Sequence, residues 1–94
     1  MVLTSSQKQI IKDSLSVYQP LLVGVFGSYA RNEASVNSDL DILIEVESKI
    51  NLLDIIGLEQ DLSEKLGIKV DLVTKRSLNK YIQKEIEKDL IRLL

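Results

Sequence analysis

The chain has 94 residues, 45% hydrophobic and 28% charged, with a formal net charge of −2, a composition typical of one soluble globular domain. No apolar run approaches the roughly 18 residues of a membrane-spanning helix, and the slightly acidic charge gives no general attraction to nucleic acid, so we expect neither a membrane nor a long nucleic acid as partner. Cysteine and histidine are both missing, which excludes disulfides, thiolate or imidazole ligands and His-dependent nucleophiles, so any metal site must use oxygen ligands, which favour Mg²⁺ or Mn²⁺.

The N-terminal region predicts a helix. Residues 1–8 lack a basic start followed by an apolar block, so we expect no signal peptide and a cytoplasmic protein. The N-cap candidates are Thr4, Ser5 and Ser6, and the helix extends to about Tyr18. One side of it carries Gln7, Ile11, Leu15 and Tyr18, with Ile10 beside them. Pro20 stops the helix.

Residues 21–26 form a short, almost wholly apolar segment, which predicts a strand buried on both faces. The strand leads into Gly27-Ser28, and residues 29–31 then predict a short helix. Glycine allows close approach of a ligand, and free amides at a helix N-terminus favour phosphate groups. Taken alone, the same residues are more typical of an ordinary turn with Ser28 as the N-cap.

Two aspartates enter the second predicted strand, which spans residues 39–46 after a loop over residues 32–37. Strand alternation places Leu40, Ile42, Ile44 and Val46 on one face, and Asp39, Asp41, Leu43 and Glu45 on the other. Asp39 and Asp41 therefore project to the same side, roughly 7 Å apart, and could share a metal ion. A lone pair of this kind is more typical of a solvated strand start, but together with the Gly27-Ser28 turn it indicates a site for a polyphosphate and a divalent metal.

A further helix and a third strand follow. Asn51 or Ser48 could cap a helix that ends at about Leu66, before Gly67, and its apolar repeat is Leu52, Ile55, Leu58, Leu62 and Leu66. Residues 68–73 predict a strand that carries Asp71. A helix crossing between two strands favours a right-handed βαβ unit with parallel pairing.

The last predicted helix runs from about residue 78 to residue 93, with a buried stripe of Leu78, Ile82, Ile86, Leu90 and Leu93 and with Tyr81 alongside. A second row, at four-residue spacing, consists of Lys80, Lys84, Lys88 and Arg92. This row could face a partner or phosphate groups, or it could be a solvated face paired with Glu85, Glu87 and Asp89.

These elements predict a single α/β (α+β) domain over residues 1–94, with helices packed on a small mixed central sheet of three to four strands. The motif Gly27-Ser28-x-x-Arg31, then Ser38-Asp39-x-Asp41, then Asp71 in an apolar strand, resembles the nucleotidyltransferase superfamily that includes polymerase beta. The resemblance covers nearly the whole chain and is closest to the minimal nucleotidyltransferases, called MNT or MntA-like proteins. It implies the polymerase-beta-like nucleotidyltransferase fold.

The resemblance implies a catalytic role for the three acidic residues. Asp39 and Asp41 would bridge two Mg²⁺ ions, for which Mn²⁺ could substitute. Asp71 would complete the first metal site and lie near the attacking hydroxyl group. The substrate implied is a nucleoside triphosphate, most plausibly ATP.

The remaining motif residues would hold the triphosphate. Gly27 and Ser28 would bind the β- and γ-phosphates. Arg31 would either contact a phosphate or pair with a site carboxylate and brace the loop. Ser38 would orient the loop that carries Asp39, or it would make a purely local hydrogen bond.

The same resemblance implies a biological role. Proteins of this kind are antitoxins paired with a HEPN ribonuclease toxin, and they neutralise the toxin by transferring AMP to a tyrosine hydroxyl on it. A first alternative is a non-catalytic antitoxin that acts by forming a complex. A second is transfer to a small molecule, for which the sequence offers no acceptor-binding region.

Overall fold

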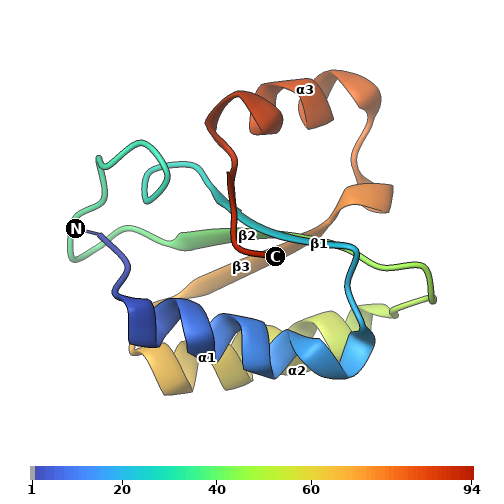
Figure 1. Ribbon diagram of the computed structural model, residues 1–94, viewed down its shortest axis with the longest axis horizontal. Helices are drawn as coiled ribbons and strands as arrows, with labels where there is room; N and C mark the ends of the chain where they lie inside the picture. The colour runs from blue at the N-terminus through green and yellow to red at the C-terminus, as the bar shows by residue number, and fades with distance from the viewer. Residues whose placement is uncertain (1) are drawn as a thin grey trace.

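The computed structural model describes residues 2–94. Within them, four β-strands form one mixed sheet, and three α-helices pack against it. In chain order the elements are α1 (Ser5–Leu15), η1 (Ser16–Tyr18), β1 (Leu22–Phe26), β2 (Leu40–Glu45), α2 (Leu52–Leu66), β3 (Val70–Thr74), η2 (Lys75–Ser77), α3 (Lys80–Asp89) and β4 (Ile91–Arg92), where η denotes a short 3-10 helix. Figure 1 shows α1 and α2 on one side of the sheet and α3 on the other. The predicted fold class is confirmed.

The sheet has the strand order β3-β2-β1-β4. As predicted, β2 and β3 pair in parallel, with α2 as the crossover between them, whereas β1 is antiparallel to both of its neighbours. The carboxyl end of β1 therefore lies beside the amino ends of β2 and β3. Both the Gly27-Ser28 turn and the predicted acidic residues belong to this end of the sheet.

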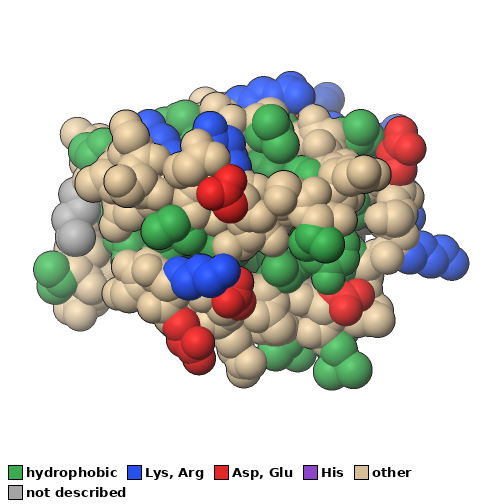
Figure 2. Space-filling view, turned by 60° about the horizontal axis from the view of Figure 1, so that its bottom comes forward, with side chains coloured by type: hydrophobic (Ala, Val, Ile, Leu, Met, Phe, Trp, Pro, Cys, Tyr) green, Lys and Arg blue, Asp and Glu red, His purple; other side chains and the backbone are tan. Residues whose placement is uncertain are grey.

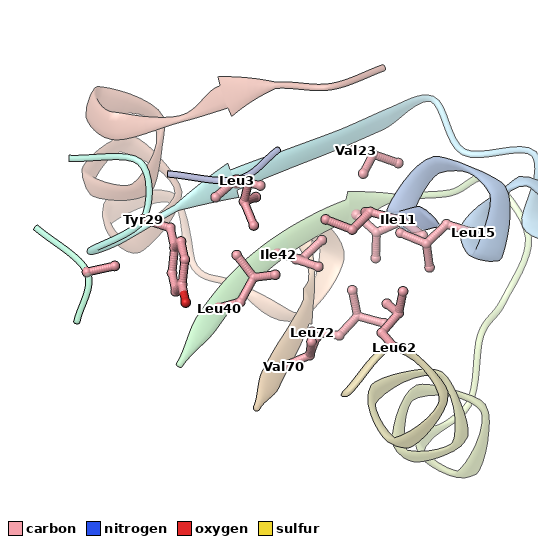
Figure 3. Close-up of a cluster of buried hydrophobic side chains, with 13 residues drawn as sticks. Leu3, Ile11, Leu15, Val23, Tyr29, Leu40, Ile42, Leu62, Val70 and Leu72 are labelled. Atoms are coloured by element: carbon pink, nitrogen blue, oxygen red, sulfur yellow. The ribbon is translucent and has the colours of Figure 1, made fainter. Parts of the chain in front are cut away.

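The hydrophobic core lies between the sheet and the helix pair α1 and α2. Leu40, Ile42 and Ile44 project from β2 into this core and are fully buried. Side chains from both helices meet them, as Figure 3 shows for Ile11 and Leu62. Asp41 and Glu45 lie on the opposite face of β2, so the predicted division of this strand into an apolar and an acid-bearing face is confirmed.

Both long helices begin at predicted N-cap residues, and α2 ends where the sequence predicts. The first helix, α1, ends at Leu15 and not at about Tyr18, because the last three residues of the predicted helix form η1. Thr4 caps α1 through a capping box with Gln7, and Asn51 caps α2 in the same way with Asp54. Gly67 closes α2 in a left-handed conformation, with φ of 67°, which glycine adopts without steric cost.

The apolar repeat of α2 is correct except at its first member. Leu62 is fully buried, and Ile55, Leu58 and Leu66 pack against the core. Leu52, in contrast, is 73% exposed, so its predicted burial is wrong. Leu52 is the first residue of the helix, one turn before the residues that reach the sheet.

The C-terminal segment differs from the prediction of one helix over residues 78–93. Instead, α3 ends at Asp89 and residues 91–92 form β4. The backbone of Val23 accepts a hydrogen bond from the N–H of Leu93 at 2.7 Å and donates one to the carbonyl oxygen of Leu94 at 3.1 Å. Because the outer edge of β1 would otherwise present unpaired backbone groups, this pairing takes precedence over continuation of the helix.

The shortened helix α3 contributes less to the core than its pattern predicts. None of its residues is buried, and Ile82 and Tyr81 are 41% and 74% exposed. The predicted row of cations is interrupted because Arg92 lies in β4. Lys88 forms an ion pair with Glu85 at 3.0 Å, which fits the alternative of a solvated, paired face. Amphipathic spacing alone therefore overestimated the burial of this helix.

The surface around α1 and α2 carries charges of both signs. Figure 2 turns this side forward and shows acidic and basic side chains interspersed with apolar ones. Across residues 2–94, every helix is too short or too polar to cross a membrane.

Candidate active site

The paired strands bring Asp41 beside Asp71 and beside the end of β1. Asp41 lies in register with Asp71 of β3 on one side and with Phe26 of β1 on the other. Residues directly opposite in a sheet point to the same face, and neighbouring strands are about 4.8 Å apart. Asp41 and Asp71 therefore form a pair of neighbouring carboxylates on the sheet face opposite α1 and α2.

Gly27, the residue that follows β1, packs directly against Asp41 of this pair. Its backbone is left-handed, with φ of 74°, and a Cβ atom at this position would overlap the carboxylate of Asp41. Only glycine meets both requirements without strain. The turn predicted to hold phosphate groups and the predicted metal ligand Asp41 are thus in direct contact.

The short helix predicted after Gly27-Ser28 is wrong, because residues 27–32 form turns. The N–H of Arg31 donates to the carbonyl oxygen of Gly27 at 3.1 Å, and the N–H of Glu33 donates to that of Ser28 at 2.8 Å. Asn32 is left-handed, with φ of 59°. This conformation ends the helical turn before a second one can form, and Asn tolerates it better than most residues do.

Electrostatics single out Asp41 among the acidic residues. Burial raises the pKa of its carboxyl group, and the nearby charges of Asp71 and then Asp39 raise the pKa further, while Arg31 acts in the opposite direction. A carboxylate destabilised in this way gains from a nearby cation.

Asp39 lies just before β2 and is oriented by the preceding loop. Its carboxylate is 3.8 Å from the Nζ atom of Lys69. Ser38 accepts a hydrogen bond from the backbone N–H of Ser35 at 2.9 Å, which is the local contact foreseen as one of its two possible roles. Ser38, Asp39 and Lys69 line a pocket of about 400 Å³.

Arg31 pairs with acidic residues outside the predicted set. Its Nε atom donates to Glu33 at 2.8 Å, and a terminal nitrogen donates to Asp89 at the end of α3 at 3.0 Å. Both contacts raise the pKa of the guanidinium group. Asp89 is a residue that sequence reasoning missed, because no local pattern connects the end of α3 to the turn after β1.

A family model described as the nucleotidyltransferase domain matches residues 6–93. The chain belongs to the nucleotidyltransferase family. The match spans α1 to β4 and includes every residue of the predicted site.

Similar proteins carry names in keeping with this family. The chain is 51% identical over 85 residues to a Methanocaldococcus jannaschii protein named "putative protein adenylyltransferase", covering 89% of this chain and 84% of that protein. It is 40% identical over 90 residues to the protein adenylyltransferase MntA of Thermococcus cleftensis, covering 96% of this chain and 87% of that one.

A solved structure resembles the whole domain. It is described as a toxin-antitoxin with AMP-PNP, and it matches with a TM-score of 0.85 and 26% identity over 97% of this chain and 73% of that chain. The resemblance of this sequence to minimal nucleotidyltransferases is confirmed, and the chain is an enzyme of the nucleotidyltransferase class.

The donor set of this nucleotidyltransferase fits a hard divalent cation. Asp41 and Asp71 offer neighbouring carboxylates, Asp39 acts on the same site through its charge, and all three supply the oxygen atoms that Mg²⁺ prefers. Among residues 2–94, no three acidic side chains are already close enough to hold a metal ion. Asp39 lies within 3.8 Å of the Lys69 ammonium group instead.

The position of Asp71 is supported by α2, which sequence reasoning also missed. The N–H groups of Val70 and Leu72, on either side of Asp71, donate to Ser63 at 3.0 Å and to Glu59 at 2.7 Å. β3 is an edge strand of the sheet. The Ser63 and Glu59 side chains therefore accept hydrogen bonds from backbone N–H groups that have no neighbouring strand as partner. The spacing of four residues between Glu59 and Ser63 is the signal that places both on one side of the helix.

A second pocket, larger than the one beside Asp39, lies elsewhere. It has a volume of about 720 Å³ and lies at the opposite end of β2 and β3, where Glu45, Lys75 and Gln83 are among its lining residues. It contains none of the predicted site residues. We assign the active site to the Asp41 end, because the chemistry and the family motif coincide there.

Proposed function

We propose that this nucleotidyltransferase transfers AMP from ATP to a hydroxyl group of a partner protein, most simply a tyrosine, and releases pyrophosphate. The partner would be a HEPN ribonuclease toxin, and the modification would neutralise it. The observation that carries this proposal is the contact of Gly27 with Asp41, which lies in register with Asp71. The turn predicted to hold phosphate groups and two carboxylates thereby lie at the same end of the sheet.

The names of similar proteins support the choice of substrate. The Thermococcus relative is named a protein adenylyltransferase, which indicates AMP as the transferred group and a protein as the acceptor. The similar solved structure is a toxin-antitoxin with an ATP analogue. Both are consistent with a nucleotide donor and a protein acceptor for this chain.

The reaction would proceed in one displacement. The acceptor oxygen attacks the α-phosphorus of ATP, a new oxygen–phosphorus bond forms, and the bond to the bridging oxygen of the β-phosphate breaks, so that pyrophosphate leaves. Gly27 and Ser28 would bind the β- and γ-phosphates through backbone amides and the Ser28 hydroxyl. Asp71 would accept the proton of the attacking hydroxyl group.

The carboxylates of Asp39, Asp41 and Asp71 would hold Mg²⁺. The metal, when bound, supplies positive charge that stabilises the α-phosphate and the leaving pyrophosphate. Without that charge, three acidic residues would repel the triphosphate, which is itself strongly negative.

The test is to incubate the purified chain with ATP, MgCl₂ and a candidate HEPN toxin, and to measure the mass of the toxin by mass spectrometry. We expect the mass to increase by one or more AMP units. The variant Asp39→Ala/Asp41→Ala should retain the native circular dichroism spectrum and add no AMP. Neutralisation of the toxin by this variant would instead support the non-catalytic antitoxin, whereas AMP transfer by it would refute the assigned site.

A further inference from the structure

We propose that Asp89 is a positioning residue that, through Arg31, holds the Gly27-Ser28 turn in the geometry that binds the triphosphate. This inference rests on the proposed function, because it assumes that the turn binds phosphate groups. Asp89 is the last residue of α3 and immediately precedes the segment that forms β4. The sequence motif of the nucleotidyltransferases does not include Asp89.

Arg31 links the turn to the rest of the protein at two levels. Its backbone N–H belongs to the turn and donates to the carbonyl oxygen of Gly27. Its guanidinium group reaches outward to two acidic residues. The contacts of the Arg31 side chain can therefore restrict the conformation of the turn backbone that would face the phosphate groups.

The two partners of Arg31 differ in what they can fix. Glu33 is two residues away along the chain and moves with the turn itself. Asp89 is 58 residues away and lies on another element. Of these two contacts, only the one with Asp89 connects the turn to α3.

The location of Asp89 is electrostatically unfavourable without Arg31. An acidic side chain in the last turn of a helix lies near the negative end of the helix dipole. The guanidinium group of Arg31 compensates this at 3.0 Å, and the Asp89 side chain is only 34% exposed. This ion pair connects the end of α3, a helix without buried residues, to the turn.

The experiment is a double-mutant cycle on binding of a non-hydrolysable ATP analogue with MgCl₂, measured by titration calorimetry. Asp89→Asn should weaken binding by about fivefold, the upper range for a solvent-accessible ion pair. In the Arg31→Ala background the same substitution should have no further effect, because Asp89 acts only through Arg31. In AMP transfer, the KM for ATP should rise by a similar factor while kcat changes less than about twofold.

Two further variants separate positioning from stability. Glu85→Gln removes the same charge from α3 but affects only an ion pair with Lys88, so binding should stay that of the wild type. Asp89→Glu keeps the carboxylate and should restore most of the affinity.

The inference is overturned if Asp89→Asn binds the analogue as the wild type does, or if its effect and that of Arg31→Ala are independent and multiply. A lower melting temperature of Asp89→Asn with unchanged affinity would likewise overturn it. If the wild-type protein itself fails to bind the analogue, the proposed function fails and not only this inference.

Discussion

Asp71 lies directly opposite Asp41 on the neighbouring parallel strand, and the register that places them together is fixed on the other face of the sheet. There, Leu40 pairs with Val70 and Ile42 with Leu72, and all four side chains are buried. A shift of one residue would expose these side chains. Burial of the apolar face thus holds two carboxylates side by side despite their repulsion.

Replacement of Asp41 should separate stability from activity. We expect Asp41→Asn to lower AMP transfer by at least about 10²-fold, because charge stabilisation at the α-phosphate is lost. In EDTA its melting temperature should equal or exceed that of the wild type, because a half-buried charge beside Asp71 and Asp39 is removed.

Added metal should stabilise the wild type selectively. At ten times the dissociation constant, Mg²⁺ should stabilise the fold by about 1.4 kcal/mol, or about 6 to 11 °C in melting temperature. Asp41→Asn should show a much smaller increase in the same scan. Equal increases for both proteins would mean that Asp41 is not a ligand.

The raised pKa of Asp41 has a consequence for the metal-free protein. The ionised carboxylate is less stable in the folded than in the unfolded chain, so this group destabilises the fold above its folded-state pKa. The penalty should decline as the pH falls through that pKa and disappear below the ordinary value of 3.8. Urea unfolding in EDTA should therefore show a smaller stability gain for Asp41→Asn over the wild type at acidic pH than at pH 7.

Gly27→Ala should be more harmful than its matched control, Gly67→Ala. Both glycines are left-handed, so both substitutions incur backbone strain of about 1 kcal/mol. At Gly67 no atom lies within 4 Å of the added Cβ, whereas at Gly27 the added atom overlaps the Asp41 carboxylate.

Gly27→Ala should therefore lose roughly 1–2 kcal/mol more than the control in urea unfolding, by analogy with other overpacked sites. AMP transfer should fall strongly for Gly27→Ala and stay near wild type for Gly67→Ala. Equal losses of stability and activity in both variants would contradict the contact with Asp41.

Glu59 should prove important for the strand that carries Asp71. Glu59→Ala leaves the partly buried N–H of Leu72 without its acceptor, at a cost of about 1–3 kcal/mol. Glu59→Gln retains an acceptor oxygen and should lose less. Glu64→Ala, which changes an exposed residue of the same helix, is the control and should stay within about 0.5 kcal/mol of the wild type in urea unfolding. Comparable stability of Glu59→Ala and Glu64→Ala would argue against this support of β3.

Local sequence patterns determined much of this protein. Alternation in residues 39–46 predicted which face of β2 carries Asp41 and Glu45, and capping residues predicted the limits of α2. The spacing of Gly27-Ser28, Asp39-x-Asp41 and Asp71 indicated the family that the domain match confirms. Alternation and capping depend on backbone geometry and burial within a few residues, which is why the sequence alone contains these two signals.

Contacts distant in sequence decided the rest. The apolar spacing from Leu78 to Leu93 is compatible with one helix. Residues 91–92 instead pair with the edge of β1 and form β4. The link from Arg31 to Asp89 depends on where α3 ends. Only the tertiary structure determines which strand or side chain each of these groups contacts, because hydrogen bonds and ion pairs between separate elements produce no periodic pattern in the sequence.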